Sequence, residues 1–292
     1  MASVEEGRVP FRGHETWYRR FRAHEPTGAP LLCLHGGPGC SHLGFEALEG
    51  LADERDVVLY DQVGGGNSSR STDTALWTVE LFVAEVSAVR AALGLERVHV
   101  LGHSWGGMLA LEVALTQPAG LESLVLSSTL SSSRLWASEA LRLRAELPDD
   151  VRSVLDAHEA AGTTDDPAYE AAVRDYLGRH LCRIDPWPDV VEEIMRTTSL
   201  GVYETMWGPN EMLPTGTLAD WDVTDSLGEI HVPALVLCGR HDEATPHQAE
   251  VIVAGIADAE LVVFEESAHL TTVEEPERYV DVVRAFLRRV EA

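Results

Sequence analysis

The sequence predicts an α/β protein: a mostly parallel sheet with helices on both faces, interrupted by an inserted helical cap domain. Short apolar runs bounded by turn residues alternate with helical patterns, as in proteins with parallel sheets. This alternation stops over residues 129–225 and then resumes, and 292 residues are enough to bury a full core. We therefore expect a core formed by residues 1–128 and 226–292, with residues 129–225 as a helical cap.

The first half of the core begins with a predicted strand hairpin over residues 8–23, which turns at Arg12-Gly13. Apolar runs typical of buried strands follow at 31–34, 57–60, 98–101 and 121–126. Residues 78–93 form a predicted helix whose apolar face, at i, i+3, i+4, i+7 spacing, comprises Val79, Phe82, Val83, Val86 and Val89. We expect the charged side chains of this helix to point away from that face: Glu80, Glu85 and Arg90.

The predicted cap is rich in Ala, Arg, Asp and Glu and has no comparable apolar strand run. Its helix-like stretches lie at 134–146, 149–160, 167–181 and 187–198. Strand character returns at 233–238 and 261–264, and a final helix is predicted from about 276 to 290. The residues after the predicted cap therefore complete the core.

The charge and the composition of the chain exclude several classes of function. A formal net charge of −26 argues against binding to nucleic acids or anionic membranes. All 22 basic residues are arginine, so pyridoxal-phosphate, P-loop and Ser–Lys chemistry, which need a lysine, are excluded. The 12 histidines show no metal-ligand spacing. We expect neither a metal nor another cofactor.

The cysteines and the N-terminus bear on the compartment. Cys33, Cys40, Cys182 and Cys238 show no C-x-x-C spacing, so we expect free thiols in a reducing cytoplasm. The first residues lack the basic region and apolar run of a signal peptide, and no apolar stretch approaches membrane-spanning length. These features predict a cytoplasmic protein and leave the oligomeric state open.

Residues 102–106, Gly-His-Ser-Trp-Gly, match the G-x-S-x-G pattern and follow the apolar run 98–101. In a nucleophile elbow this pattern turns a strand sharply into a helix and exposes the serine. Gly102 and Gly106 are needed there because side chains would collide in so tight a turn. The alternative is a glycine-rich turn with a capping serine. We expect Ser104 to be a catalytic nucleophile.

A serine hydroxyl needs a base, and the base needs a group that orients it. In this architecture the acid follows a late strand and the histidine lies near the end of the chain. Asp242 follows the run 234–238, and His269 follows the run 261–264. The alternatives are a cap on a helix beginning near Pro246 for Asp242, and an ordinary loop position for His269. His103 is adjacent to Ser104, and its side chain should point away from the hydroxyl.

Acyl transfer also needs hydrogen-bond donors for the oxyanion of the tetrahedral intermediate. One should be the backbone N–H of Trp105, the residue after the nucleophile. The other should come from the glycine-rich turn at 34–39. We assign it to Gly37, because Pro38 has no N–H to offer.

Several motifs together give a specific resemblance. They are His-Gly-Gly-Pro-Gly at 35–39, Tyr-Asp-Gln-x-Gly-x-Gly-x-Ser at 60–68, Gly-His-Ser-Trp-Gly-Gly at 102–107, Met-Trp-Gly-Pro-Asn-Glu at 206–211, Gly-x-x-Asp-Glu-x-x-Pro at 239–246, and His269 near Glu275-Pro276. The chain resembles the proline iminopeptidase family of α/β-hydrolases, and within it the tricorn-associated type of aminopeptidase. The likeness runs from residue 31 to residue 276, cap included.

This resemblance implies the α/β-hydrolase fold and a serine aminopeptidase that acts on a small molecule or short peptide with a free amino terminus. It implies that Glu211 and Glu243 hold the α-amino group of the substrate, since a buried ammonium needs anionic partners. Tyr203 and Trp207 are candidates for the pocket of the first side chain, and equally for the core of the cap. The expected reaction cleaves the amide after a free prolyl or small residue such as alanyl.

Other functions compete with this interpretation. Some relatives are amino-acid amidases, or remove an aminoacyl group such as alanyl from a polyketide amine during antibiotic assembly. A long apolar tunnel in the cap would favour them, and candidate contributors are Leu135, Trp136, Ile194 and Met195. A generic esterase or a non-catalytic binding protein is less favoured. Epoxide hydrolases and haloalkane dehalogenases use Asp as the nucleophile, so Ser104 argues against them.

Overall fold

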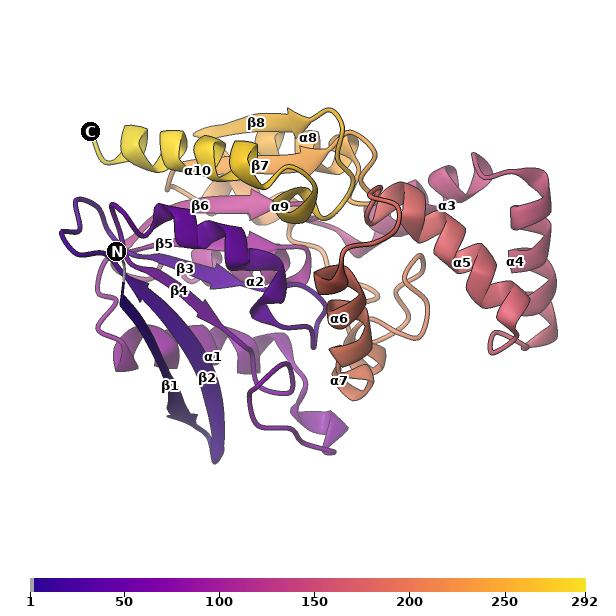
Figure 1. Cartoon of the computed structure of the whole chain (residues 1–292), viewed down its shortest axis with the longest axis horizontal. Helices are drawn as coiled ribbons and strands as arrows, with labels where there is room; N and C mark the ends of the chain where they lie inside the picture. Colours follow the sequence, from indigo (N-terminus) through magenta and orange to yellow (C-terminus); the bar gives the residue numbers. More distant parts are fainter. Residues whose placement is uncertain (1–2) are drawn as a thin grey trace.

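The computed structural model describes residues 3–292 and is built around an eight-stranded sheet (Figure 1). The strands, in sheet order, are β1 (Ser3–Phe11), β2 (His14–Arg22), β4 (Val57–Tyr60), β3 (Leu31–Leu34), β5 (Val98–His103), β6 (Leu121–Ser127), β7 (Ala234–Gly239) and β8 (Ala259–Phe264). The β1–β2 hairpin is antiparallel and β2 pairs antiparallel with β4, whereas β4, β3, β5, β6, β7 and β8 pair in parallel. The predicted mostly parallel sheet is confirmed. Residues 1–2 of the predicted core lie outside the described part.

The central strands are buried on both faces, as parallel strands covered by helices should be. Every residue of β3 is buried, and its side chains alternate between two apolar clusters. Leu32 and Leu34 belong to the cluster formed with α1 (Val79–Ala92), α2 (Trp105–Leu115) and α8 (Pro246–Gly255). Leu31 and Cys33 pack on the other face against η1 (His42–Leu51) and α10 (Pro276–Val290). Helices therefore cover both faces of the sheet and bury its apolar side chains.

A helical insertion separates β6 from β7 and lies beyond the carboxyl ends of the parallel strands (Figure 1). It comprises α3 (Ser133–Ala145), α4 (Asp149–Ala161), α5 (Pro167–His180), α6 (Asp189–Thr197) and α7 (Leu200–Met206), followed by η3 (Thr224–Glu229). The first four match the predicted stretches, whereas α7 was not predicted. An isolated β-bridge between Ser132 and Asp222 helps to join the two ends of the insertion. Among residues 3–292, no helix has both the length and the apolar character needed to cross a membrane.

One prediction about α1 is wrong. Glu80 is exposed as expected, but Glu85 is fully buried. Its Oε1 accepts hydrogen bonds from the Thr16 hydroxyl at 2.5 Å and from the Val63 amide at 2.9 Å. The helical spacing identified the face that meets the sheet, but the loop after β4 also covers the side of the helix that carries Glu85. Burial raises the pKa of Glu85 to about 8.

Candidate active site

Ser104 lies at the sharp turn between β5 and α2. Its backbone has φ 54° and ψ −122°, a region that costs a non-glycine residue about 1–3 kcal/mol. The flanking glycines leave no room for side chains. A Cβ on Gly106 would lie 1.9 Å from the Leu34 carbonyl oxygen, and one on Gly102 would lie 2.1 Å from the Gly106 oxygen. The predicted elbow geometry is therefore present, with the serine half-buried at its tip.

Asp242 and His269 meet at the carboxyl ends of β7 and β8. The Nδ1 atom of His269 lies 2.7 Å from Oδ1 of Asp242, and both residues are buried. The Ala244 amide also donates to Oδ1 of Asp242 at 2.7 Å. The N-cap of α8 is Thr245, so Asp242 faces the histidine and is not the cap of that helix.

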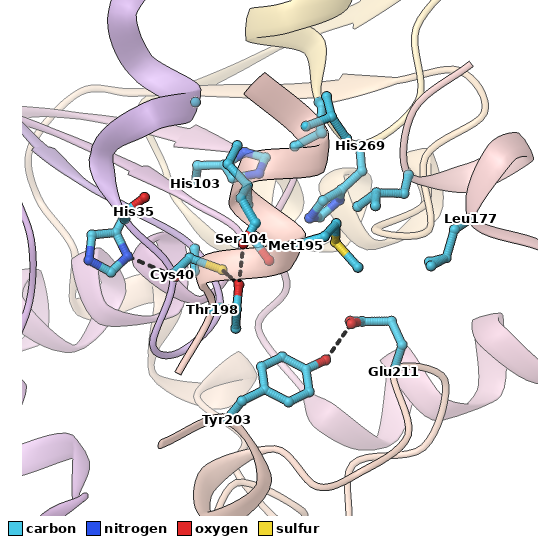
Figure 2. Close-up of a pocket in the computed structure, with 18 of the residues that line it drawn as sticks. His35, Cys40, His103, Ser104, Leu177, Met195, Thr198, Tyr203, Glu211 and His269 are labelled. Atoms are coloured by element: carbon cyan, nitrogen blue, oxygen red, sulfur yellow. Dashed lines mark hydrogen bonds between the residues drawn. The ribbon is translucent and has the colours of Figure 1, made fainter. Parts of the chain in front are cut away.

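Ser104 and His269 line one cavity of about 280 Å³, between the core and the helical insertion. Gly37, Glu211, Glu243 and Tyr203 line the same cavity. In Figure 2 the side chains of Ser104 and His269 lie on one side of it, and those of Tyr203 and Glu211 face them from the other. Six of the residues singled out in the sequence are thus gathered around one space, with Asp242 directly behind His269.

The pKa of His269 is raised above the ordinary value of 6.5. Burial lowers it, but the charge and the hydrogen bond of Asp242, together with the charge of Glu211, outweigh that effect. The contact with Asp242 uses Nδ1 and leaves Nε2 free to exchange a proton with a group in the cavity. His269 therefore has the environment of a general base that is held by a carboxylate.

Glu211 and Glu243 bring two carboxylates to the cavity, whose described lining includes no arginine. Burial raises the pKa of Glu211, although the Tyr203 hydroxyl, which donates to its Oε2, and the nearby His269 oppose the shift. The pKa of Glu243 is raised well above its usual range by burial and then by the charges of Glu211 and Asp242. Oε2 of Glu243 is buried without a hydrogen-bond partner among residues 3–292. A cationic group in the cavity would stabilise both carboxylates.

The two predicted oxyanion donors lie beside the elbow. Trp105 is the first residue of α2, where a helical N–H has no partner within the helix. Gly37 lines the cavity with φ +112°, and a Cβ there would lie 2.8 Å from the Cys40 amide nitrogen. Across the described residues neither amide N–H donates to a protein acceptor. Both are free to bind an oxygen that forms next to Ser104.

The structure separates the two aromatic candidates of the cap. Tyr203 lines the cavity, but Trp207 is absent from its described lining. The indole N–H groups of Trp207 and Trp136 both donate to the Glu211 carbonyl oxygen, at 3.0 and 3.2 Å, and the two rings pack edge to face. Trp207 thus supports the Glu211 segment from behind.

The candidates for an apolar tunnel also divide. Ile194 and Met195 line the cavity, whereas Leu135 and Trp136 do not belong to its described lining. The apolar wall continues onto α5 and its C-cap with three residues that were not candidates from the sequence: Val173, Leu177 and Leu181. This wall lies on the side of the helical insertion.

Sequence reasoning missed His180, at the end of α5. Its carbonyl oxygen accepts the backbone N–H groups of Glu243 and His269, each at 3.2 Å. Its Nδ1 lies 2.9 Å from the His241 carbonyl oxygen. These contacts join the insertion directly to the two loops that carry the acid and the histidine. No residue pattern could have revealed the two hydrogen bonds of the His180 carbonyl, because they involve only backbone atoms.

Comparisons with known proteins agree with this geometry. Residues 29–276 match the family described as alpha/beta hydrolase fold. The chain is 39% identical to a proline iminopeptidase of Heyndrickxia coagulans, over 98% of this chain and 99% of that protein. It is 41% identical to a proline iminopeptidase of Lactobacillus crispatus (strain ST1), over 97% and 98%.

Two solved structures are similar along almost the whole chain. The structure of a proline iminopeptidase from Mycobacterium smegmatis superposes with a TM-score of 0.93 at 44% identity, over 98% of both chains. The structure of VinJ superposes with a TM-score of 0.94 at 41% identity, over 98% of this chain and 99% of that one. Both similarities include the helical insertion as well as the sheet.

Proposed function

The chain belongs to the proline iminopeptidase family of α/β hydrolases, and we propose that it cleaves the amide bond after a free N-terminal amino acid, prolyl or small such as alanyl. It acts as a serine hydrolase through an acyl-enzyme. The observation that carries the proposal is the pair of carboxylates, Glu211 and Glu243, on the wall of the cavity that also contains Ser104. An esterase for neutral substrates has no need of two negative charges there.

Substrate binding starts from those charges. Glu211 and Glu243 bind the α-ammonium of the substrate, which neutralises them and fixes the first residue at one end of the cavity. Its acyl carbon then lies over the hydroxyl of Ser104. Tyr203 holds the Glu211 carboxylate through its hydroxyl and lines the space next to the first side chain. Binding energy is thereby used to orient the reacting carbonyl.

The chemical steps follow from the arrangement around His269. Its Nε2 removes the proton of Ser104 as Oγ attacks the acyl carbon, while Asp242 holds Nδ1–H and stabilises the imidazolium. The negative oxygen of the tetrahedral intermediate binds the amides of Gly37 and Trp105. The imidazolium returns the proton to the leaving nitrogen, and the C–N bond breaks. Water then attacks the acyl-enzyme with His269 again as the base, which releases the amino acid and restores Ser104.

Residues 129–225 serve as the cap of this enzyme, and residues 1–128 and 226–292 as its catalytic core. Support comes from the position of the insertion between β6 and β7 and from the composition of the cavity wall. Ser104 and His269 come from the core, whereas Glu211 and Tyr203 come from the insertion. The core therefore performs the reaction, and the cap helps to select the substrate together with Glu243 of the core.

A second candidate keeps the chemistry and changes the leaving amine. In this alternative the enzyme removes an aminoacyl group, for example alanyl, from a non-peptide amine such as a polyketide intermediate in antibiotic biosynthesis. The apolar wall favours it, since Val191, Ile194 and Met195 of α6 and Leu177 of α5 offer no polar group to a peptide backbone. Leu200, also part of the lining, remains 64% exposed.

The two functions are tested with one panel of substrates. We expect prolyl and alanyl p-nitroanilides to be hydrolysed and their N-acetylated counterparts to be hydrolysed at least ~100-fold more slowly. The kcat/KM for an alanyl amide of a long apolar amine is then compared with that for an alanyl dipeptide. A higher value for the apolar amide favours the non-peptide leaving group, and a higher value for the dipeptide favours the peptide. Equal rates with and without N-acetylation would refute the aminopeptidase proposal and leave a generic esterase or amidase.

The nucleophile is tested separately. Ser104→Ala should lower kcat by at least about 10⁴-fold and abolish labelling by a fluorophosphonate probe, with the fold retained. Wild-type protein that is not labelled at Ser104 would instead be a non-catalytic binding protein.

The setting of the enzyme is also a proposal. We infer a cytoplasmic enzyme that acts on small molecules or short peptides and binds neither nucleic acids nor membranes. The net charge of −26 and the four free cysteines, three of them buried, support this inference.

A further inference from the structure

Gln62 is the second residue after β4, in the loop that covers Glu85, and is almost completely buried. It is not part of the described cavity lining, so it does not meet the substrate. Its backbone carbonyl accepts the Gly65 N–H, and its other polar groups have partners near the elbow. Its backbone N–H donates to Nε2 of His35 at 2.9 Å, and its side-chain amide donates to the His35 carbonyl oxygen at 2.9 Å. Its Oε1 accepts the indole N–H of Trp105 at 2.8 Å.

These contacts determine the tautomer of His35. Since Nε2 accepts a hydrogen bond from a backbone amide, the ring proton must lie on Nδ1. Nδ1–H then donates to the Gly36 carbonyl oxygen, 2.8 Å away. Burial lowers the pKa of His35, although the charge of Asp61 opposes this shift. The lowered pKa keeps the ring neutral. The ring therefore acts as a fixed link between Gln62 and the Gly36 carbonyl.

The Gly36 carbonyl and the Gly37 N–H belong to one peptide unit. This peptide is trans, so its C=O and N–H point in opposite directions. When the oxygen is held by His35, the Gly37 N–H must point the other way. The loop lies against the nucleophile, because a Cβ on Gly36 would be 3.1 Å from Cβ of Ser104. Two successive glycines would otherwise allow this peptide to rotate easily.

The third contact of Gln62 reaches the other oxyanion donor. Trp105 supplies its backbone N–H at the start of α2, and its indole is held by Oε1 of Gln62. One buried side chain thus binds both the segment that orients the Gly37 amide and the residue that carries the second amide. We propose that Gln62 is a positioning residue that sets the relative placement of the two oxyanion donors, and that His35 transmits this placement to Gly37. The inference rests on the proposed function.

A misplaced oxyanion donor affects the transition state more than the bound substrate, because the negative charge exists only in the former. Loss of one donor typically lowers kcat by about 10²–10³-fold. Gln62→Met conserves volume and removes the side-chain hydrogen bonds to the His35 carbonyl and the Trp105 indole, while the backbone N–H that holds the His35 ring remains. We expect kcat for alanyl p-nitroanilide to fall about 10–100-fold with KM changed by less than about twofold. Affinity for an alanyl boronic acid, which forms a tetrahedral adduct with Ser104, should fall by a similar factor.

A second variant covers the case in which Gln62→Met does not fold. Trp105→Phe removes only the indole N–H and should show the same pattern, a lower kcat at constant KM, to a smaller extent. Asn67→Ala is the matched control. It removes one hydrogen bond to Asp61 from the same loop but leaves His35 and Trp105 untouched, and it should keep kcat and boronate affinity within about twofold.

The outcomes separate this inference from the proposed function. If Gln62→Met and Trp105→Phe lower only the melting temperature, or raise KM as much as they lower kcat, Gln62 is a structural residue and the inference is wrong. The same result from Asn67→Ala as from Gln62→Met would also overturn it, since general loosening of the loop would then explain both. Activity retained by Ser104→Ala would refute the proposed function itself.

Discussion

Asp242 and His269 come from loops after neighbouring parallel strands, and their carboxylate oxygen and ring nitrogen lie 2.7 Å apart. Both groups are shielded from water, so the carboxylate interacts strongly with the ring. The Ala244 amide, which also binds Oδ1, keeps the carboxylate in place. The orientation of His269 therefore depends on the negative charge of Asp242.

Asp242→Asn tests this dependence. An amide in place of the carboxylate no longer favours the tautomer with the proton on Nδ1, and we expect kcat to fall by about 10⁴-fold. The fold should persist, because the amide has almost the same volume. Asp258→Asn, an equivalent change at an exposed position of the turn before β8, is the control and should retain full activity. A loss below about tenfold for Asp242→Asn would remove Asp242 from the catalytic group.

The pH dependence of the reaction follows from the raised pKa of His269. The base must be neutral to accept the serine proton, so activity is lost as pH falls through this pKa. For an N-acetylalanyl ester, whose binding does not need the glutamates, we expect the acidic midpoint of kcat/KM to lie above pH 6.5. Glu211→Gln removes a charge that raises the pKa, and should move this midpoint to lower pH. A wild-type midpoint at or below 6.5 would contradict the assignment.

Glu211→Gln also tests the recognition of the substrate ammonium. A hydrogen bond to a charged group contributes about 1.5–3 kcal/mol, so kcat/KM for alanyl p-nitroanilide should fall about 10–100-fold. The N-acetylated ester should change by less than about threefold at a pH where His269 is neutral. Glu204→Gln, exposed on the neighbouring helix α7, makes the same change of charge and should affect neither substrate. Equal losses on both substrates would exclude the ammonium-binding role.

Glu85→Gln concerns stability and not catalysis. The pKa of Glu85 is about 8 in the folded protein and about 4.5 in the unfolded chain, so the folded state binds more protons between these values. Stability should therefore decrease as pH rises from about 5 to 8, by at most about 1.4 kcal/mol per pH unit from this group. Urea unfolding at several pH values should show a flatter dependence for Glu85→Gln. The exposed Glu80→Gln should behave like wild type, and identical slopes in all three proteins would contradict the prediction.

Much of the core could be predicted from local patterns. The strands at 31–34 and 57–60 were assigned without error because each is a short apolar run between turn residues. The elbow was equally clear, since its Gly-x-Ser-x-Gly pattern is contiguous in the sequence, although the collision at Gly106 involves Leu34 and His35 at the end of β3. The loops that carry Asp242 and His269 followed from their positions after late strands.

The features that sequence patterns missed or left open have a common physical origin. Glu85 is buried by the loop that follows β4, and Trp207 is turned away from the cavity by its contact with the Glu211 carbonyl. Helix α7 is only seven residues long, which is too short to show a clear helical period. His180 acts through its backbone carbonyl, which every residue possesses. None of these features depends on a periodic pattern.

The sequence by itself determined the order of most strands and helices along the chain and the candidates for the reactive side chains, because these depend on local propensity, apolar periodicity and residue type. Only the tertiary structure decided which polar groups face the cavity and which are buried as supports. Tyr203 and Trp207 are separated by one turn of chain, yet one meets the cavity and the other the wall behind it. The reason is that burial and hydrogen bonding depend on segments distant in sequence, whose approach is fixed only when the cap and the core pack together.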